Sequence, residues 1–169
     1  MRVGLLADTH DRLPAISALL ARMAEGGVGL VLHAGDYCSP FSLIPFIDTQ
    51  MALAGVFGRN DGDPEGIKAK AQQGMGLELY ESPHSFEIGG RRILVVHDLG
   101  EVNVRSIESH QLVVHGCSHR QDRSERSGAV LVNPGEGCGW LYGVPSAAIV
   151  DLDNLDVEMI RLEGDEWRT

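Results

Sequence analysis

The sequence predicts an α/β protein in which two mixed β-sheets pack face to face with helices on the outside. The first half of the chain alternates short apolar runs with stretches of helical periodicity, whereas the second half consists almost entirely of short apolar runs. Five of these runs end in acidic, imidazole or glycine residues. At 169 residues the chain is expected to form one domain over residues 1–169.

The first half is expected to form a β-α-β-α-β unit. Residues 3–7 are a continuous apolar run typical of a buried strand, and residues 13–23 carry apolar side chains at helical spacing. Asp11 is the expected N-terminal cap of this helix, and glycines follow its end. The other elements of this half are a strand over 28–32, a helix over 41–47, a strand over 51–57 and a helix from Pro64 to about 73.

The second half is expected to be rich in strands. Gly89 and Gly90 separate two apolar runs by a tight turn, which indicates a hairpin. One helix is expected over 101–109. The expected strands cover 77–80, 84–88, 93–97, 112–115, 123–127, 129–132, 147–151 and 157–162.

Composition excludes several classes of protein. A composition of 43% hydrophobic and 22% charged residues is typical of an ordinary soluble domain. The sequence has no apolar run long enough to span a membrane. The N-terminus does not resemble a signal peptide and the three cysteines do not suggest a disulfide framework, so the cytoplasm is the expected compartment. A net charge of −10 argues against general binding of nucleic acids but permits a divalent cation.

The ends of five predicted strands carry the candidate chemistry. Because ligands of open α/β sheets bind at the carboxyl ends of the strands, these five loops are expected to meet. The loops are Asp8-x-His10, Gly35-Asp36, Gly58-Arg59-Asn60-Asp61, His97-Asp98 and Gly116-Cys117-Ser118-His119. Carboxylates and imidazoles together suit Mn²⁺, Fe²⁺ or Zn²⁺, and two such ions about 3.5–4 Å apart activate water for phosphoryl chemistry. The pattern therefore predicts metal-dependent hydrolysis of a phosphate ester.

These five motifs, closed by Asn133-Pro134-Gly135, resemble the calcineurin-like metallophosphoesterase superfamily over almost the whole chain, and the short length resembles its small bacterial and archaeal phosphodiesterase branch. The resemblance implies a four-layer α/β/β/α sandwich, phosphodiester hydrolysis and one or two divalent ions per chain. Mn²⁺ is the first expectation, with Zn²⁺, Fe²⁺ or Ni²⁺ as alternatives. It further implies a small phosphate-ester substrate and a homo-oligomer.

Carried over residue by residue, the resemblance implies that Asp8, His10 and His119 hold the first metal. Asp36 would bridge both metals, and His97 would bind the second. Arg59 and Cys117 stand where the family has an Asn and a His ligand of that second metal. The guanidinium of Arg59 cannot lose its charge and would repel a cation, whereas a Cys117 thiolate could replace the imidazole but favours softer metals.

The sequence leaves three states of the second metal site open. The ion binds with altered ligands, or binds only together with substrate, or is replaced by the Arg59 guanidinium, which would then bind substrate phosphate. Asn60 and Asp61 are candidate catalytic residues that position the substrate or a ligand. Many family members have a catalytic His where this chain has Asn60, so the residue that protonates the leaving group is not assigned.

Each candidate also has a structural interpretation. Cys117 could be a buried thiol, Arg59 a surface residue and His97 a hydrogen-bonded core histidine. In the functional interpretation, Asp98 orients His97 or another ligand. The main rival function is a catalytically inert scaffold for protein interaction, as in the retromer subunit of the superfamily. The departures at Arg59 and Cys117 favour that rival, and the five retained ligands argue against it. A nucleotide-binding module of another family would need a glycine-rich phosphate loop, which the sequence does not have.

Overall fold

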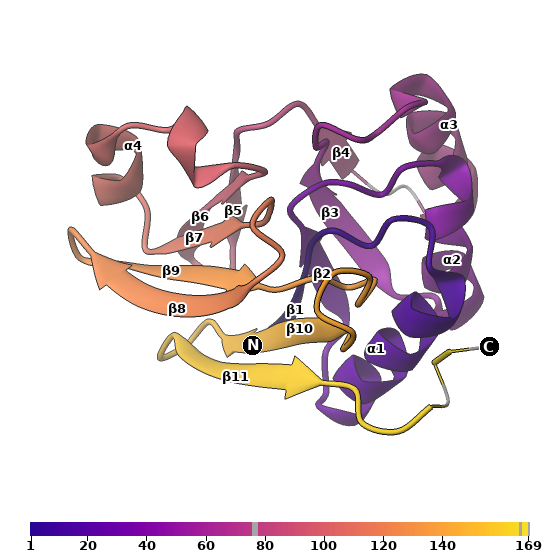
Figure 1. The fold of residues 1–169 in the computed structure, drawn as a ribbon. Helices are drawn as coiled ribbons and strands as arrows, with labels where there is room; N and C mark the ends of the chain where they lie inside the picture. Colours follow the sequence, from indigo (N-terminus) through magenta and orange to yellow (C-terminus); the bar gives the residue numbers. More distant parts are fainter. Residues whose placement is uncertain (76–77, 166, 169) are drawn as a thin grey trace.

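A six-stranded mixed sheet, made mostly from the first half of the chain, forms one side of the molecule (Figure 1). The computed structural model describes residues 1–75, 78–165 and 167–168. The strands in spatial order are β11 (Asp156–Arg161), β10 (Ser146–Asp151), β1 (Arg2–Leu6), β2 (Leu30–His33), β3 (Ala52–Val56) and β4 (Glu78–Tyr80). Strands β1 to β4 run parallel, whereas β10 is antiparallel to both β1 and β11.

A five-stranded mixed sheet packs against the first. Its strands in spatial order are β5 (His84–Ile88), β6 (Arg91–Val96), β7 (Leu112–His115), β9 (Ala129–Pro134) and β8 (Gln121–Arg126). Strands β6, β7 and β9 are parallel, and the two outer strands are antiparallel to their neighbours. Gly89 and Gly90 both have positive φ in the turn between β5 and β6, as the hairpin expectation requires.

Helices cover the outer faces of both sheets. The first sheet is covered by α1 (Leu13–Glu25), the 3₁₀ helix η1 (Pro40–Leu43), α2 (Ile44–Thr49) and α3 (Pro64–Met75), as Figure 1 shows. The second sheet is covered by the shorter η2 (Leu99–Glu101) and α4 (Val104–Glu108). None of the described helices is both long and apolar enough to cross a membrane.

Three apolar clusters fill the spaces between the layers. Leu5, Val56, Val95 and Val114 belong to the cluster between the two sheets. A second cluster joins the first sheet to its helices, and a third joins the second sheet to α4 through Ile107. The arrangement is the four-layer α/β/β/α sandwich with two mixed sheets that the sequence predicted.

Most elements lie within a few residues of their predicted positions, with three differences. The expected helix over 41–47 is two helices, and Pro45 lies in the first turn of the second one. The expected helix over 101–109 is also divided, because the side chain of Asn103 accepts a hydrogen bond from the Ser106 N–H and starts a new helix there. The first residue of the expected strand over 77–80 lies outside the described residues.

The prediction that Asp11 caps α1 was wrong. Arg12 occupies the cap position and makes no side-chain cap hydrogen bond. The Asp11 carboxylate instead accepts hydrogen bonds from the hydroxyls of Ser39 and Ser42, at 2.7 and 3.0 Å. Asp11 therefore joins the loop after β1 to η1, and it does so beside His10.

Candidate metal centre

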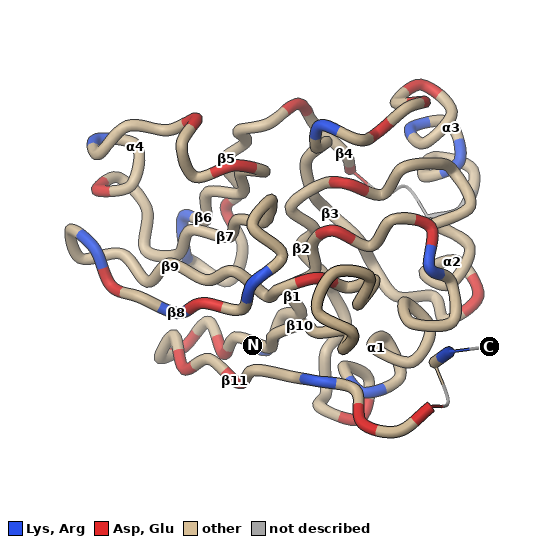
Figure 2. Tube along the Cα trace, viewed as in Figure 1, with Lys and Arg blue, Asp and Glu red and all other residues tan. Residues whose placement is uncertain are grey.

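The loops that follow β1, β2 and β7 bring four predicted ligands together. One ligand atom from each of Asp8, His10, Asp36 and His119 lies within 4.8 Å of the other three. Figure 2 shows the acidic residues in the loops that follow the parallel strands of the first sheet. Because His119 comes from the second sheet, the group spans the interface between the two sheets.

These loops hold their side chains in an unusual backbone conformation. Asp8, His10, Asp36 and His119 have φ values of 52°, 41°, 64° and 60°, all in the left-handed region. Each such residue costs on the order of 1–3 kcal/mol and persists only where surrounding contacts hold it. Backbone hydrogen bonds supply these contacts, since Asp8 N donates to Gly35 O and His10 N to Asp36 O. Strain of this kind gathers at functional sites.

Two buried polar atoms in this group have no hydrogen-bond partner among the described residues. They are Oδ1 of Asp8 and Nε2 of His10. Nε2 of His10 lies 3.5 Å from Oδ2 of Asp36, and Nε2 of His119 lies 3.7 Å from Oδ1 of Asp8. A buried carboxylate oxygen and a buried imidazole nitrogen that lack protein partners are costly unless a cation lies between them. The donor set thus fits a divalent metal of the Mn²⁺, Fe²⁺ or Zn²⁺ type.

Burial and charge set the protonation of this group. Burial raises the pKa of Asp8 to about 6, although His119 and His97 oppose the shift. Burial likewise lowers the pKa of His10, which keeps the imidazole neutral and able to coordinate. In the absence of an ion, Asp8 is therefore a carboxylate whose charge is poorly compensated.

His119 and His97 are oriented by acceptors on the far side of each ring. Nδ1 of His119 lies 3.0 Å from Oε2 of Glu136, and Nδ1 of His97 lies 2.8 Å from the carbonyl oxygen of Ala34. In both residues Nε2 faces the carboxylates, at 3.5 Å from Oδ1 of Asp36 in the case of His97. An acceptor on Nδ1 fixes the tautomer in which Nε2 is free to bind a metal.

Asn60 and Asp61 act on the loops of the site. Asn60 donates from its backbone to Oδ1 of Asp36 at 2.9 Å and from its side-chain amide to Oδ2 at 2.7 Å. Asp61 accepts hydrogen bonds from the backbone N–H groups of Gly58, Asp36 and Cys38. Asn60 therefore holds the carboxylate of Asp36 directly, and Asp61 fixes the two loops to each other.

Gly58 packs closely against the carboxylate and imidazole of the site. A Cβ placed on it would lie 2.2 Å from Oδ1 of Asp36 and 2.8 Å from Cε1 of His97. Such distances are far below van der Waals contact, so a side chain here would displace one of the two residues. Only glycine lets the loop after β3 approach this closely.

Arg59 and Cys117 lie together at the exposed side of the site. Arg59 Nη2 is 2.5 Å from Oδ2 of Asp98 and 3.6 Å from Oε1 of Glu101, and Nη1 is 3.7 Å from Sγ of Cys117. Burial raises the pKa of the Cys117 thiol, and nearby Asp98 adds to the shift, so the neutral thiol predominates. Asp98 was expected to orient His97, but its carboxylate pairs with Arg59 and caps η2.

Glu136 was not among the residues predicted from the sequence, whereas Asn133 has a structural role beside the site. Glu136 is 1% exposed, although nothing in the sequence beyond its place between two glycines singles it out. Asn133 donates from its amide to Gly116 O and to the hydroxyl of Ser118, which fixes the loop that carries His119. The available signal for Glu136 was an acidic residue between two glycines just after a predicted strand.

Comparison with known proteins identifies relatives over nearly the full length. The family model for the calcineurin-like phosphoesterase superfamily domain matches residues 1–155. Phosphodiesterase MJ0936 of Methanocaldococcus jannaschii is 28% identical over 166 residues, which cover 96% of this chain and all of the relative.

Solved structures show the same architecture. The structure of an archaeal phosphodiesterase superposes with a TM-score of 0.88 at 27% identity, covering 96% of this chain and 100% of the other. YfcE, a phosphoesterase from E. coli, gives 0.67 at 16% identity, covering 96% of this chain and all of YfcE. Vps29 from Entamoeba histolytica, solved with zinc, gives 0.67 at 19% identity, covering 96% of this chain and 98% of the other. At these identities the last two establish the fold alone.

Proposed function

The chain belongs to the calcineurin-like phosphoesterase superfamily, and we propose that this metal-dependent phosphoesterase hydrolyses small phosphodiesters. The observation that carries the proposal is the group formed by Asp8, His10, Asp36 and His119, in which two buried ligand atoms have no hydrogen-bond partner within the described part of the chain. A relative that is named a phosphodiesterase and is aligned over its whole length supports the diester as the substrate class. The unit proposed to carry this activity is a single domain over residues 1–169.

We propose Asp8, His10, Asp36 and His119 as the ligands of one divalent ion, and His97 and Cys117 as candidates for a second. When bound, such an ion supplies a water of lowered pKa and positive charge for the phosphoryl oxygens. Mn²⁺ is the preferred ion, with Zn²⁺, Fe²⁺ and Ni²⁺ as alternatives. A neutral Cys117 thiol beside the Arg59 guanidinium is a poor ligand, so the second position is expected to bind an ion weakly.

The side chains around the ligands prepare the site. Glu136 and the carbonyl of Ala34 hold two imidazoles in their coordinating tautomers. Asn60 fixes both oxygens of Asp36, so this carboxylate need not reorient when it binds. We therefore propose Asn60 and Asp61 as positioning residues for the reaction, because an amide does not exchange protons near neutral pH and the Asp61 carboxylate accepts from three backbone N–H groups.

Arg59 is the proposed contact for the substrate phosphate. The side chain of Arg59 is 59% exposed and pairs with Asp98, the residue after His97. It therefore lies at the solvent-facing side of the proposed metal ligands. A guanidinium whose outer face reaches solvent can exchange part of its pairing with Asp98 for a phosphoryl oxygen. A small phosphate ester is the proposed substrate, and the net charge of −10 argues against general nucleic-acid binding. Self-association remains a prediction from the family.

Metal analysis combined with hydrolysis of bis(p-nitrophenyl) phosphate tests the proposal. Wild type should bind at least one ion per chain and release nitrophenol with Mn²⁺, Ni²⁺, Zn²⁺ or Fe²⁺. Asp36→Asn should lose most of its metal binding and most of its hydrolytic activity. The matched control Asp122→Asn, on exposed strand β8, should keep both. Equal inactivity of wild type and Asp36→Asn with all four metals would instead favour the scaffold function.

A further inference from the structure

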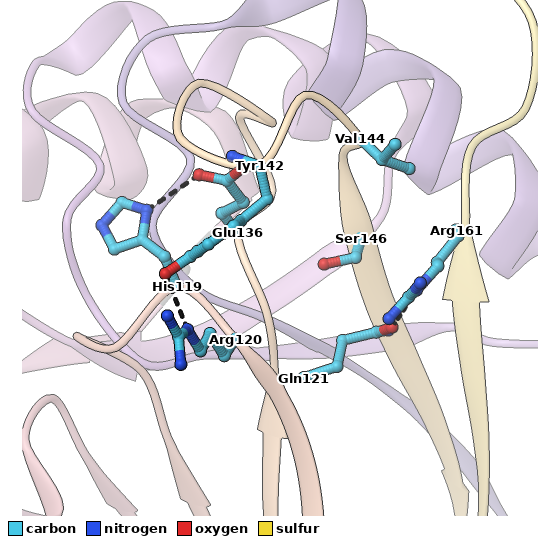
Figure 3. Close-up of a pocket in the computed structure, with 8 residues that line it drawn as sticks. All are labelled: His119, Arg120, Gln121, Glu136, Tyr142, Val144, Ser146 and Arg161. Carbon is cyan, nitrogen blue, oxygen red and sulfur yellow. Dashed lines mark hydrogen bonds and ion pairs between the residues drawn. The ribbon is translucent and has the colours of Figure 1, made fainter.

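A cavity of about 390 Å³ opens beside His119 and lies outside the group of proposed ligands (Figure 3). His119 and Arg120 border it on one side, Gln121 and Ser146 form its middle, and Arg161 stands on the other side. The loop over residues 135–145 closes it through Tyr142. Its volume falls within the range of about 300–1,000 Å³ that is usual for small-ligand sites.

Two guanidinium groups face this cavity, and within the described structure neither has a carboxylate partner. Arg120 Nε donates to the hydroxyl of Tyr142 at 2.7 Å, and Arg161 Nε donates to Oε1 of Gln121 at 2.6 Å. Among the described residues no Asp or Glu oxygen lies within 4.0 Å of either guanidinium, although the chain has 24 acidic residues. Hydrogen bonds within the described structure thus use only the Nε of each group, and the paired Nη atoms remain available to a ligand.

The acid in the cavity wall is engaged by donors of the protein. Oε2 of Glu136 accepts from His119 and from the Leu141 N–H, and Oε1 accepts from the Tyr142 N–H at 2.6 Å. With 1% of its surface exposed, this carboxylate faces the protein. The exposed charge of the cavity is therefore positive, in a protein whose net charge is −10.

We propose that this cavity binds a second anionic group of the substrate, a phosphate carried by one of the two alcohol arms of the diester. The inference rests on the proposed function and narrows its substrate class. His119 belongs both to the proposed ligand group and to the cavity wall, so a diester bound at the metal centre reaches the cavity with one arm. The planar forks of Arg120 and Arg161 match the oxygens of a phosphate.

The remaining wall suits the organic part of such an arm. The ring of Tyr142 lies under the Arg120 guanidinium, whose carbon is 5.3 Å from the ring centroid, and Val144 adds an apolar surface next to it. A sugar or a flat base rests on such a surface, with its phosphate toward the guanidinium groups. The arm that this cavity selects is therefore a phosphorylated alcohol rather than a bare aryl or alkyl group.

Paired substrates test the inference on the intact, metal-loaded protein. The probes are bis(p-nitrophenyl) phosphate and a dithymidine phosphodiester without a terminal phosphate, with a 5′-phosphate, or with a 3′-phosphate. For wild type, kcat/KM should be at least about 10-fold higher for one phosphorylated form than for the unphosphorylated form, the gain expected of one charge-assisted pair. Arg161→Gln should bring this ratio close to one, and Arg120→Gln should lower it as well.

The control is Arg126→Gln, which removes the same charge from the exposed far end of β8 and should leave the ratio unchanged. Binding of inorganic phosphate to the metal-free protein, followed by calorimetry, gives a second measurement and should be lost in Arg161→Gln but kept in Arg126→Gln. The inference would be overturned if Arg161→Gln kept the wild-type ratio of kcat/KM for the phosphorylated and unphosphorylated substrates. It would also be overturned if Arg126→Gln lowered that ratio as much as Arg161→Gln does. Failure to hydrolyse bis(p-nitrophenyl) phosphate would overturn the proposed function instead, because that probe carries no second anion.

Discussion

Nδ1 of His119 and Oε2 of Glu136 lie 3.0 Å apart, although the two residues are brought together from the loops after two different strands. The Glu136 carboxylate is buried and also holds the backbone of Leu141 and Tyr142. It thus connects the orientation of a proposed ligand to the loop that closes the neighbouring cavity.

Glu136→Gln should weaken metal binding by about 10–100-fold, the usual cost of removing an acceptor from a ligating imidazole. The amide lacks the charge of the carboxylate and turns an NH₂ group toward backbone donors. Competition with a chromogenic chelator measures the affinity. Glu125→Gln, an exposed change on β8, should have no effect. An affinity equal to that of wild type would show that His119 does not need this acceptor.

Gly58→Ala should reduce activity by about 100-fold, because displacement of a reactive group by an ångström is enough for such a loss. The added Cβ would meet Oδ1 of Asp36 and Cε1 of His97. Gly62→Ala is the matched control, since its Cβ would have only one neighbour, the Cys38 carbonyl oxygen at 3.9 Å. Comparable kinetics of the two variants would mean that the loop after β3 relaxes without disturbing the site.

Asp8→Asn should stabilise the metal-free protein at pH 7.5. Burial raises the pKa of Asp8 to about 6 from 3.8, so the unfolded chain ionises first and the folded state becomes less stable as the pH rises from about 4 to about 6. Above that window the ionised carboxylate destabilises folded wild type by on the order of 3 kcal/mol, which corresponds to about 6–12 °C in Tm.

Thermal unfolding in the presence of a chelator at pH 4 and at pH 7.5 measures this difference. The advantage of Asp8→Asn should fall to a small fraction at pH 4, where the folded wild type is largely protonated at this residue and the unfolded chain is about half protonated. With saturating metal at pH 7.5 the order should reverse, because the variant loses a proposed ligand. An advantage of equal size at both pH values would exclude the ionisation of Asp8 as its cause.

Arg59→Asn should raise KM for bis(p-nitrophenyl) phosphate about 10-fold through the loss of a charge-assisted hydrogen bond. The same change removes a fixed positive charge and introduces an amide oxygen, so native mass spectrometry at high metal concentration should detect an additional ion per chain. Arg105→Asn on α4 is the matched control. Unchanged KM together with unchanged stoichiometry would assign Arg59 to its ion pair with Asp98 alone.

The fold was predictable because its signals are local. Continuous apolar runs such as 3–7 mark buried strands, and helical spacing marks α1, so the order of elements alone indicates two sheets with helices outside. The meeting of the ligand loops at one edge of the first sheet was predictable for a related reason. The carboxyl ends of parallel strands within one sheet must lie side by side, which places Asp8 next to Asp36.

Contacts between loops that are distant in the chain could not be predicted from the sequence. The pairing of Glu136 with His119 depends on how the loop after β9 folds back, which no spacing rule expresses. The errors at Asp11 and Asp98 have a similar cause, because a short acidic side chain near a helix start has several partners within reach. Serine hydroxyls compete for Asp11, and a guanidinium competes for Asp98.

The span of the site across both sheets bears on when an ion can enter during synthesis. Asp8 and Asp36 emerge from the ribosome early, but His119 and Glu136 follow only after more than two-thirds of the chain has been made. High-affinity binding is therefore expected only after the second sheet has formed and docked, because the early part of the chain carries just three of the four proposed ligands. On this order of synthesis, metal binding would follow the docking of the two sheets and would depend on it.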